Sequence, residues 1–181
     1  MSEVTQLLRR ASEGDEAARE PLYRLLYPEL MCMAHRQLAR SGTLSLDATA
    51  LLHEAYLRLG EQGVLPDANQ RVFFAYASKV MRSVIVDYVR QRGAQKRGGA
   101  VTSITLNTDL ADLIASEHSI TDVENALEIL EQIDARACRV VEMRYFGGMT
   151  DEDIASVLGT SLATVRRDWR KARAFLYEQL N

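Results

Sequence analysis

The sequence has little cysteine, proline and glycine, and it has no long apolar run. Its two cysteines, Cys32 and Cys138, form no CxxC pair and have no histidine at ligand spacing, which argues against a disulfide framework or a zinc site and favours a reducing cytoplasm. With 3 prolines, 10 glycines and few alternating Val/Ile/Thr runs, a β-sandwich or barrel is not expected. Charges interrupt each apolar stretch, so we expect no membrane span, and the charged N-terminus lacks the apolar core of a signal peptide.

Apolar residues make up 47% of the 181 residues, and their spacing of three and four predicts an all-α fold. Helices are expected over residues 3–40, 46–59, 71–92, 121–133, 135–146, 151–158 and 162–180. The first should break or bend at Gly14-Asp15 and at Tyr27-Pro28, because Pro28 disfavours a helical conformation at Tyr27. Residues 60–70 contain two glycines, a proline and an asparagine and are expected to form a loop.

A segment rich in Ser and Thr, residues 98–120, has weak periodicity and predicts a flexible linker with one short helical turn near residues 109–115. The linker divides the chain into two small helical domains, residues 1–97 and 121–181. We therefore expect two hydrophobic cores, each of modest size.

The net charge of −3 conceals an alternation along the chain. Residues 88–99 carry a net charge of +4, residues 101–153 carry −9, and residues 163–175 carry +4. Two basic patches separated by an acidic middle predict local contacts with a polyanion rather than a uniformly cationic surface.

The most specific pattern lies near the C-terminus. Thr150 precedes a helix and has Asp153 three residues later, which is close to a capping box. Gly159 supplies a tight turn, and Ser161 caps the next helix. This spacing is typical of a helix-turn-helix, whose second helix enters the major groove of DNA.

At about 100° per residue, the second helix has two distinct sides. Val165, Trp169, Ala172 and Leu176 fall on the side expected to pack. The other side is small or cationic: Ala163, Arg166, Arg167, Arg170, Lys171 and Ala174. The residues near the helix start are expected to reach base edges, namely Ala163, Thr164, Arg166 and Arg167, and those farther along to hold phosphates, namely Arg170, Lys171 and Arg173. The alternative is an ordinary solvated helix face.

With these residues in view, the chain resembles the extracytoplasmic-function (ECF) group of bacterial RNA polymerase sigma factors. Residues 127–176 look like the family's region 4, with Arg144-Tyr145-Phe146 in one of its helices and Thr164 to Arg167 in its recognition helix. In the N-terminal half, residues 15–23 look like region 2.1, Leu51 to Leu59 like region 2.2, and Phe74 to Arg92 like regions 2.3–2.4. The likeness covers nearly the whole chain in the family's order.

The resemblance implies a non-catalytic, cofactor-free protein that binds core RNA polymerase and promoter DNA. The second domain would bind the −35 element, and the first would capture and help to melt the −10 element. The −10 candidates are Phe74, Tyr76, Lys79, Arg82 and Ser83, followed by Arg90, Arg92, Lys96 and Arg97 for duplex phosphates. For Phe73, Phe74 and Tyr88 taken singly, packing in the core is the stronger expectation. Ser83 stands where the family often has Asn.

One departure concerns region 2.2, where the family usually has an acidic cluster that pairs with the polymerase clamp. Here Thr49 and Ala50 replace two expected acids, while Asp47 and Glu54 remain. The candidate polymerase interface is Asp47, Thr49, Leu51, Glu54 and Arg58. We hypothesise that a Ser/Thr kinase phosphorylates Thr49 in the first turn of the helix, which restores negative charge at the positive end of the helix dipole. An unmodified Thr that bonds to the backbone is the alternative, and control by an anti-sigma protein also stays open.

Two other classes of function compete with this interpretation. A helix-turn-helix regulator could bind duplex DNA without polymerase, although aromatics running into arginines over residues 71–97 argue against it. An enzyme is disfavoured because His35, His53 and His118 are scattered, and no phosphate loop, nucleophile elbow or paired-carboxylate motif is present. His53-Glu54 is not followed by a second His at residue 57, so it is no zincin motif and His53 is expected on a helix surface.

Overall fold

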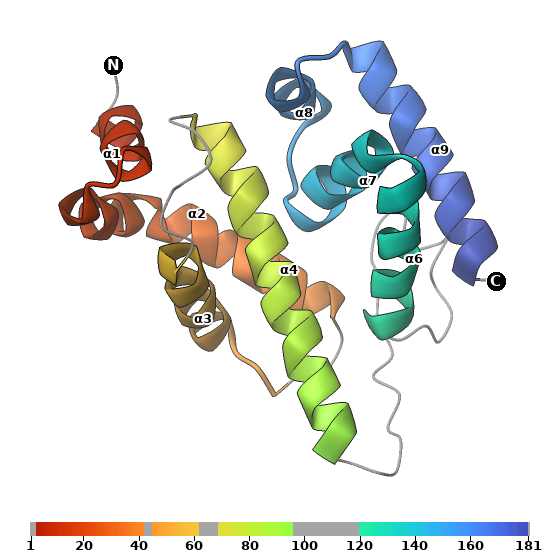
Figure 1. Cartoon of the computed structure of the whole chain (residues 1–181), viewed down its shortest axis with the longest axis horizontal. Coiled ribbons are helices and arrows are strands. Elements are labelled where there is room, and N and C mark those ends of the chain that lie inside the picture. The colour runs from red at the N-terminus through yellow and green to blue at the C-terminus, as the bar shows by residue number, and fades with distance from the viewer. Residues whose placement is uncertain (1–2, 42–44, 62–68, 96–119, 181) are drawn as a thin grey trace.

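The computed structural model describes residues 3–41, 45–61, 69–95 and 120–180. Every regular element in these ranges is a helix, which confirms the all-α prediction (Figure 1). Within the same ranges, no helix is both long and apolar enough to cross a membrane.

The N-terminal helices, which we call the front lobe (residues 3–95), surround one hydrophobic core. They are α1 (Glu3–Ser12), the 3₁₀ turn η1 (Glu16–Ala18), α2 (Arg19–Arg40), α3 (Ala48–Glu61) and α4 (Gln70–Gln95). The core is filled by side chains with almost no exposed area, among them Leu8, Leu26, Leu30, Leu51, Leu52 and Met81. Burial of these leucines, at roughly 1.5–3 kcal/mol each, contributes far more to the stability of the lobe than helix propensity does.

The structure confirms the break at Gly14-Asp15 and shows no break at Tyr27-Pro28, where a break or a bend was expected. Gly14 adopts a positive φ of 92°, and the Asp15 carboxylate accepts a hydrogen bond from the backbone N–H of Ala17 to cap η1. Helix α2 instead continues through Pro28. Pro28 is exposed, while Leu26 and Leu30 on either side are fully buried, so tertiary packing outweighs the backbone hydrogen bond that proline cannot make.

Several helix ends differ from the sequence prediction by one to three residues, and two helices are extended at their C-terminal ends. Helix α3 includes Gly60 and Glu61, which were expected to start a loop, and α4 extends to Gln95 rather than residue 92. Both are ordinary uncertainties of helix ends, where capping signals are weak. Of the rest of the expected loop, residues 62–68 lie outside the described residues, Asn69 is non-helical, and Gln70 already begins α4.

The C-terminal helices, which we call the rear lobe (residues 120–180), surround a second core. They are α6 (Ile120–Ile133), α7 (Ala135–Val141), the π-helical turn η2 (Glu142–Phe146), α8 (Asp151–Leu158) and α9 (Leu162–Leu180). The most deeply buried side chains are Leu127, Val140, Val141, Ile154, Val165 and Leu176. The expected helix over residues 135–146 is present, but its last turn is π-helical.

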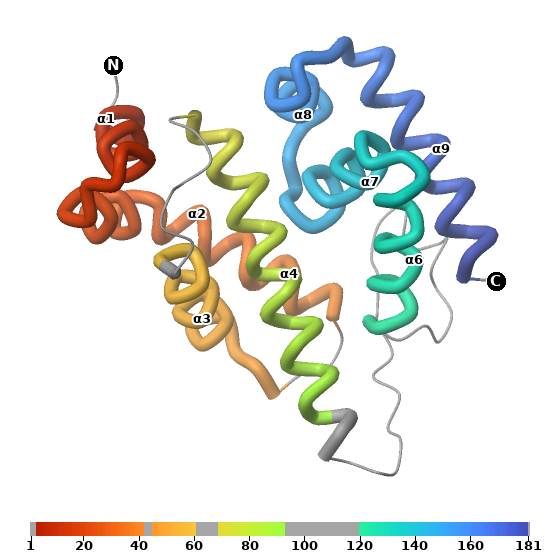
Figure 2. The backbone as a smooth tube through the Cα atoms, in the orientation of Figure 1, coloured from red at the N-terminus to blue at the C-terminus, as the bar shows by residue number. Residues whose placement is uncertain are grey.

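The two lobes pack against each other. Figure 2 shows α4 with α1 and α3 on one side and α6 on the other, while α2 crosses behind it toward the rear lobe. Ile120, at the start of α6, is buried in the front-lobe core, and Ala75 of α4 packs against the rear-lobe core. The expected linker, residues 98–120, lies outside the described residues except for Ile120, which is helical.

Candidate nucleic-acid interface

The helix-turn-helix is formed by α8 and α9, and each of its local signals is present. The Thr150 hydroxyl accepts a hydrogen bond from the Asp153 backbone N–H at 3.1 Å. The Asp153 carboxylate in turn accepts from the Thr150 hydroxyl at 2.8 Å, and this bond lowers the Asp153 pKa. Gly159 adopts the left-handed conformation, with φ of 60°, and Ser161 Oγ accepts from the Thr164 N–H at 3.2 Å. The predicted caps and turn are therefore confirmed.

The packed side of α9 is also the one that the sequence predicts. Val165 and Ala172 have 0% of their surface exposed, Leu176 has 1% and Trp169 has 9%. The Arg144 guanidinium lies over the Trp169 ring at 4.6 Å, as in a cation–π contact, and donates to Asp151 of α8 at 2.9 Å. These contacts fix the rotation of α9 about its axis.

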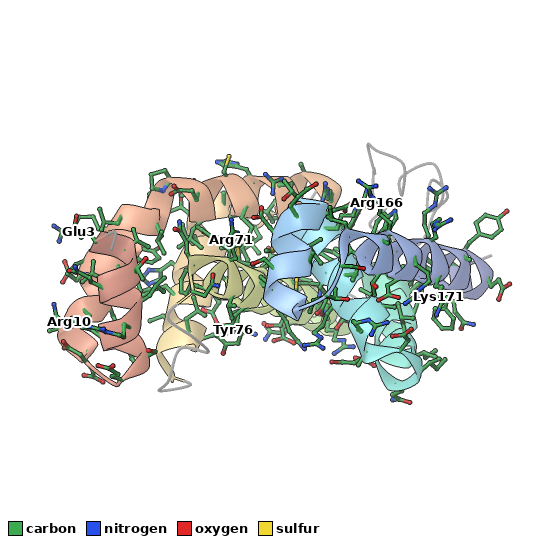
Figure 3. All side chains as sticks on the ribbon, turned by 90° about the horizontal axis from the view of Figure 1, so that it is seen from above. Glu3, Arg10, Arg71, Tyr76, Arg166 and Lys171 are labelled. Atoms are coloured by element: carbon green, nitrogen blue, oxygen red, sulfur yellow. The ribbon has the colours of Figure 1, made fainter. Side chains whose placement is uncertain are left out.

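The opposite side of α9 is consequently turned outward. Exposed there are Ala163, Arg166, Arg167, Arg170, Lys171 and Ala174, while Thr164 and Arg173 are half-buried. Arg166 approaches Asp151 at 3.5 Å but keeps 62% of its side chain exposed. Figure 3 labels Arg166 and Lys171 on this helix, away from Arg71 and Tyr76 on α4. Within the described residues, no acid is within ion-pair distance of Arg170, Lys171 or Arg173.

Asp168 has a role that the sequence analysis missed, because this residue entered it only as the one acid within the net charge of +4 over residues 163–175. Its side chain is 0% exposed, and its carboxylate accepts from Arg136 Nε at 2.5 Å and from Arg136 Nη2 at 3.3 Å. This pairing raises the pKa of Arg136. Asp168 lies three residues after Val165 and next to Trp169, so the helix spacing places it on the packed side of α9. This spacing was the sequence signal that could have indicated its burial.

The −10 candidates lie along α4. Lys79, Ser83, Arg90 and Arg92 are exposed, and Phe74, Tyr76 and Arg82 are half-buried. Phe73 is 4% exposed and belongs to the core, as expected, whereas Phe74 and Tyr88 are only half-buried. Arg92 donates to the Tyr88 hydroxyl at 3.0 Å and also contacts Ser45. Lys96 and Arg97 lie outside the described residues.

Several of these cations already have acidic partners in the rear lobe. Arg82 contacts Glu124 of α6 and bonds to Glu142 of η2 at 2.6 Å, and only 13% of its side chain is exposed. Lys79 lies 3.5 Å from Glu131. Arg90 lies 3.7 Å from Glu128. From the sequence, the acidic segment was expected only to separate the two basic patches. In the structure, its helix α6 lies directly against α4.

The candidate polymerase interface is at the start of α3. The Asp47 carboxylate accepts from the Ala50 N–H at 2.8 Å and caps the helix. Thr49 is exposed in the first turn, and within the described residues its hydroxyl makes no hydrogen bond. The placement of Leu51 at this interface needs correction, because its side chain is 0% exposed and belongs to the front-lobe core.

Arg58 joins the candidate polymerase interface to α4. Its Nη1 donates to Asp87 at 2.7 Å and to Ser83 Oγ at 3.3 Å, and its Nε donates to Glu54 at 3.3 Å. Glu54 is exposed and Arg58 is half-buried. The network couples one turn of α3 to the turn of α4 that carries Ser83.

The described histidines of the chain are scattered in the structure as they are in the sequence. His35 and His53 are exposed helix residues, as expected for His53, and His118 lies outside the described residues. No group of three or more His, Cys, Asp or Glu side chains within these ranges could hold a metal ion.

Comparisons with known proteins agree with this geometry. A family model described as "ECF sigma factor" matches residues 1–181. The chain is also 26% identical, over 176 residues, to a Mycobacterium ulcerans (strain Agy99) protein described as "ECF RNA polymerase sigma factor SigK". That alignment covers 94% of this chain and 89% of the relative.

Proposed function

Because the chain belongs to the ECF sigma factor family and is thus an alternative sigma factor for transcription initiation, we propose how its parts divide the work. Residues 1–97 bind core RNA polymerase and the −10 element, residues 121–181 bind the −35 element, and residues 98–120 link them. The protein acts in the cytoplasm as a polymerase subunit without catalytic chemistry of its own.

The outward face of α9 carries this proposal. Ala163, Thr164, Arg166 and Arg167 are near the start of a helix that a turn and two caps hold at the surface. Small side chains allow close approach to a groove, and Arg can bond bidentately to guanine. Arg170, Lys171 and Arg173 lie farther along, where phosphate contacts would fix the register.

At the −10 element the protein has to stabilise bases that have left the duplex. Phe74 and Tyr76 keep part of their ring surface accessible, and Lys79 and Ser83 are exposed on the same helix. Rings and cations together suit an unstacked strand, because stacking tolerates any base and cations neutralise phosphates. Arg82, Arg90 and Arg92 continue the cationic row toward the proposed phosphate contacts of Lys96 and Arg97.

Polymerase binding is the step at which we propose regulation. The surface beside Asp47, Glu54 and Arg58 has fewer acids than the family pattern, which weakens attraction to basic residues of the clamp. Thr49 is exposed beside the positive end of α3, so a kinase can reach it and a phosphate there adds roughly −1.5 to −2 charges at a favourable position. Phosphorylation of Thr49 by a Ser/Thr kinase then promotes core binding.

The Thr49 proposal is tested by measuring core polymerase affinity for wild type, Thr49→Glu, Thr49→Ala and the phosphorylated protein. We expect the Glu variant and the phosphoprotein to bind more tightly than wild type, and the Ala variant to match unmodified wild type. Gln6→Glu, which adds the same charge on the exposed side of α1, is the matched control and should change nothing. Equal affinities for all forms contradict regulation at Thr49.

The broader proposal is tested by run-off transcription with core enzyme and a promoter library, using the native and Thr49→Glu forms. Transcripts that start at a defined distance from a shared pair of sequence elements support it. If neither form redirects initiation but the protein still binds duplex DNA, the helix-turn-helix regulator without polymerase becomes the better account.

A further inference from the structure

The ion pairs between the two lobes all have the same polarity. Within the described residues, each pairs a cation of α4 with an acid of the rear lobe: Arg71–Asp153 at 2.5 Å, Lys79–Glu131 at 3.5 Å, Arg82–Glu124, Arg82–Glu142 at 2.6 Å and Arg90–Glu128 at 3.7 Å. No acid of α4 pairs with a cation of the rear lobe in these ranges. One-sided pairing of this kind is what a cationic DNA-binding face makes with a polyanion.

The acids on α6 are arranged as a row. Glu124, Glu128 and Glu131 are four and three residues apart, so they lie on one face of the helix at intervals of roughly 5–6 Å. Lys79, Arg82 and Arg90 on α4 face them. These three cations are also among the proposed −10 contacts, and Arg82, which keeps only 13% of its side chain exposed between Glu124 and Glu142, cannot bind a phosphate at the same time.

We propose that α6 is an internal competitor of promoter DNA: in the free protein its acidic face occupies the cationic face of α4, and the lobes must separate there before the front lobe binds the −10 element. This inference rests on the proposed function of α4. The cationic face of α9 lies outside the contact, so −35 binding is available in the closed form.

The contact between the lobes extends to α2. Arg36 Nη1 donates to the Gly147 carbonyl at 2.9 Å, and the Arg40 guanidinium lies over the Tyr145 ring at 4.3 Å. Gly148 has a φ of 65°, which disfavours other residues, and a Cβ there would lie 1.7 Å from Arg36 Nη1, so a side chain at this position would displace the end of Arg36. The contact between the lobes therefore includes close packing of α2 side chains against η2 and the turn that follows it, in addition to the ion pairs of α4.

The same contact is poorly suited to being permanent. Arg82 and Glu124 are 13% and 15% exposed, and burial raises the pKa of Glu124 although Arg82 opposes the shift. Around an interlobe cavity of about 30 Å³, four buried atoms have no partner within the described residues: Gln37 Oε1, Arg40 Nη1, Arg82 Nε and Tyr145 Oη. Desolvated charges and unpaired polar atoms offset much of the Coulomb attraction, which leaves a specific contact that a competing polyanion can open.

The test uses the full chain carrying two fluorophores, one on Cys32 and one on Gln179→Cys, both exposed positions in different lobes. Cys138 does not interfere, because it is 2% exposed and burial raises its pKa to about 12. Energy transfer reports closure, and anisotropy reports binding of a labelled oligo(dT) strand.

Glu124→Gln with Glu142→Gln removes the acids around Arg82. Glu152→Gln with Glu178→Gln makes the same charge change at exposed rear-lobe acids that form no ion pair with any described residue.

We expect the Glu124/Glu142 variant to lose energy transfer and to bind oligo(dT) about tenfold more tightly. A gain of this size follows if only about one tenth of the wild-type molecules are open and able to bind the strand. The Glu152/Glu178 control should match wild type in both energy transfer and strand binding. Glu128→Gln with Glu131→Gln, at exposed sites where we expect the rear lobe to stay folded, should shift both readouts in the same direction by a smaller factor.

Unchanged energy transfer in both interlobe variants, or opening without tighter strand binding, would overturn the inference. Run-off transcription separates this from failure of the proposed function. If wild type with core enzyme initiates at promoters while the variants behave as wild type, only the competitor role is wrong. If no form initiates with core enzyme, the sigma-factor assignment of α4 is wrong, and the competitor role falls with it.

Discussion

Two helices of this protein, α4 and α9, each carry a row of cations, and the two rows have different surroundings. On α4, Arg82 is enclosed by Glu124 and Glu142, with 13% of its side chain exposed. On α9, Arg166 keeps 62% of its side chain exposed and Arg167 keeps 57%. Similar local charge therefore produces one covered surface and one open surface. Whether a cation is available to DNA depends on which acids the fold brings against it, and this is a property of packing rather than of composition.

The largest effect is expected from removing the side chain that holds the open surface in place. Trp169→Ala should lower the free energy of unfolding of the rear lobe by about 3–5 kcal/mol, because it deletes a packed aromatic ring and the surface under Arg144. Urea unfolding followed by circular dichroism measures this. Ile133→Ala, at a rear-lobe side chain that is 67% exposed, should change the same quantity by less than about 0.5 kcal/mol. Similar losses for both would mean that Trp169 does not anchor α9.

A smaller effect is expected from shortening the cations proposed to contact bases. Arg166→Ala or Arg167→Ala should weaken binding to the −35 element by about 1–3 kcal/mol and relax the sequence preference. Binding selection from a randomised duplex library measures both quantities. Arg24→Ala, an exposed arginine of the front lobe, is the control. Identical sequence profiles for wild type and both variants would reject the assignment to base edges.

Lys171 sharpens the distinction between base and phosphate contacts on the same helix. Lys171→Ala should weaken binding to all duplexes alike and reduce the slope of log affinity against log salt by about 1, because one fewer counterion is released. Titrations at several salt concentrations measure the slope. A sequence-dependent loss with an unchanged slope would move Lys171 from the phosphate group to the base-reading group.

The smallest effect is expected at the exposed edge of the covered surface. Lys79 and Glu131 keep 50% and 55% of their side chains exposed, so solvent and salt screen their attraction. Glu131→Gln alone should change lobe closure by less than about 0.5 kcal/mol, measured by energy transfer between the two lobes. A change as large as that of the Glu124/Glu142 variant would show that the exposed pair, and not the buried one, holds the lobes together.

The helix-turn-helix could be predicted closely because its signals are local. Thr150, Gly159 and Ser161 each act within a few residues, and the spacing of Val165, Trp169 and Leu176 alone specifies the buried side of α9. The start of α3 is similar, because Asp47 caps a helix that exposes Thr49 in its first turn.

What could not be predicted depends on contacts between distant segments. Pro28 sits within α2 because leucines on neighbouring turns are buried by other helices. Leu51 was placed at the polymerase interface by its match to region 2.2 but fills the core, and Asp168 is buried because Arg136 of another helix reaches it. The pairing of Arg82 with Glu124 joins residues separated by 42 positions, and no local pattern specifies it.

The most direct test of the central claim is to probe one promoter in one complex with core polymerase, measuring DNase I protection at the upstream element and permanganate reactivity of thymines near the start site. The account predicts both in the same complex: protection that Trp169→Ala abolishes, and reactivity that shows an opened duplex. Upstream protection with no reactive thymines, whether Thr49 is native or replaced by Glu, would contradict it.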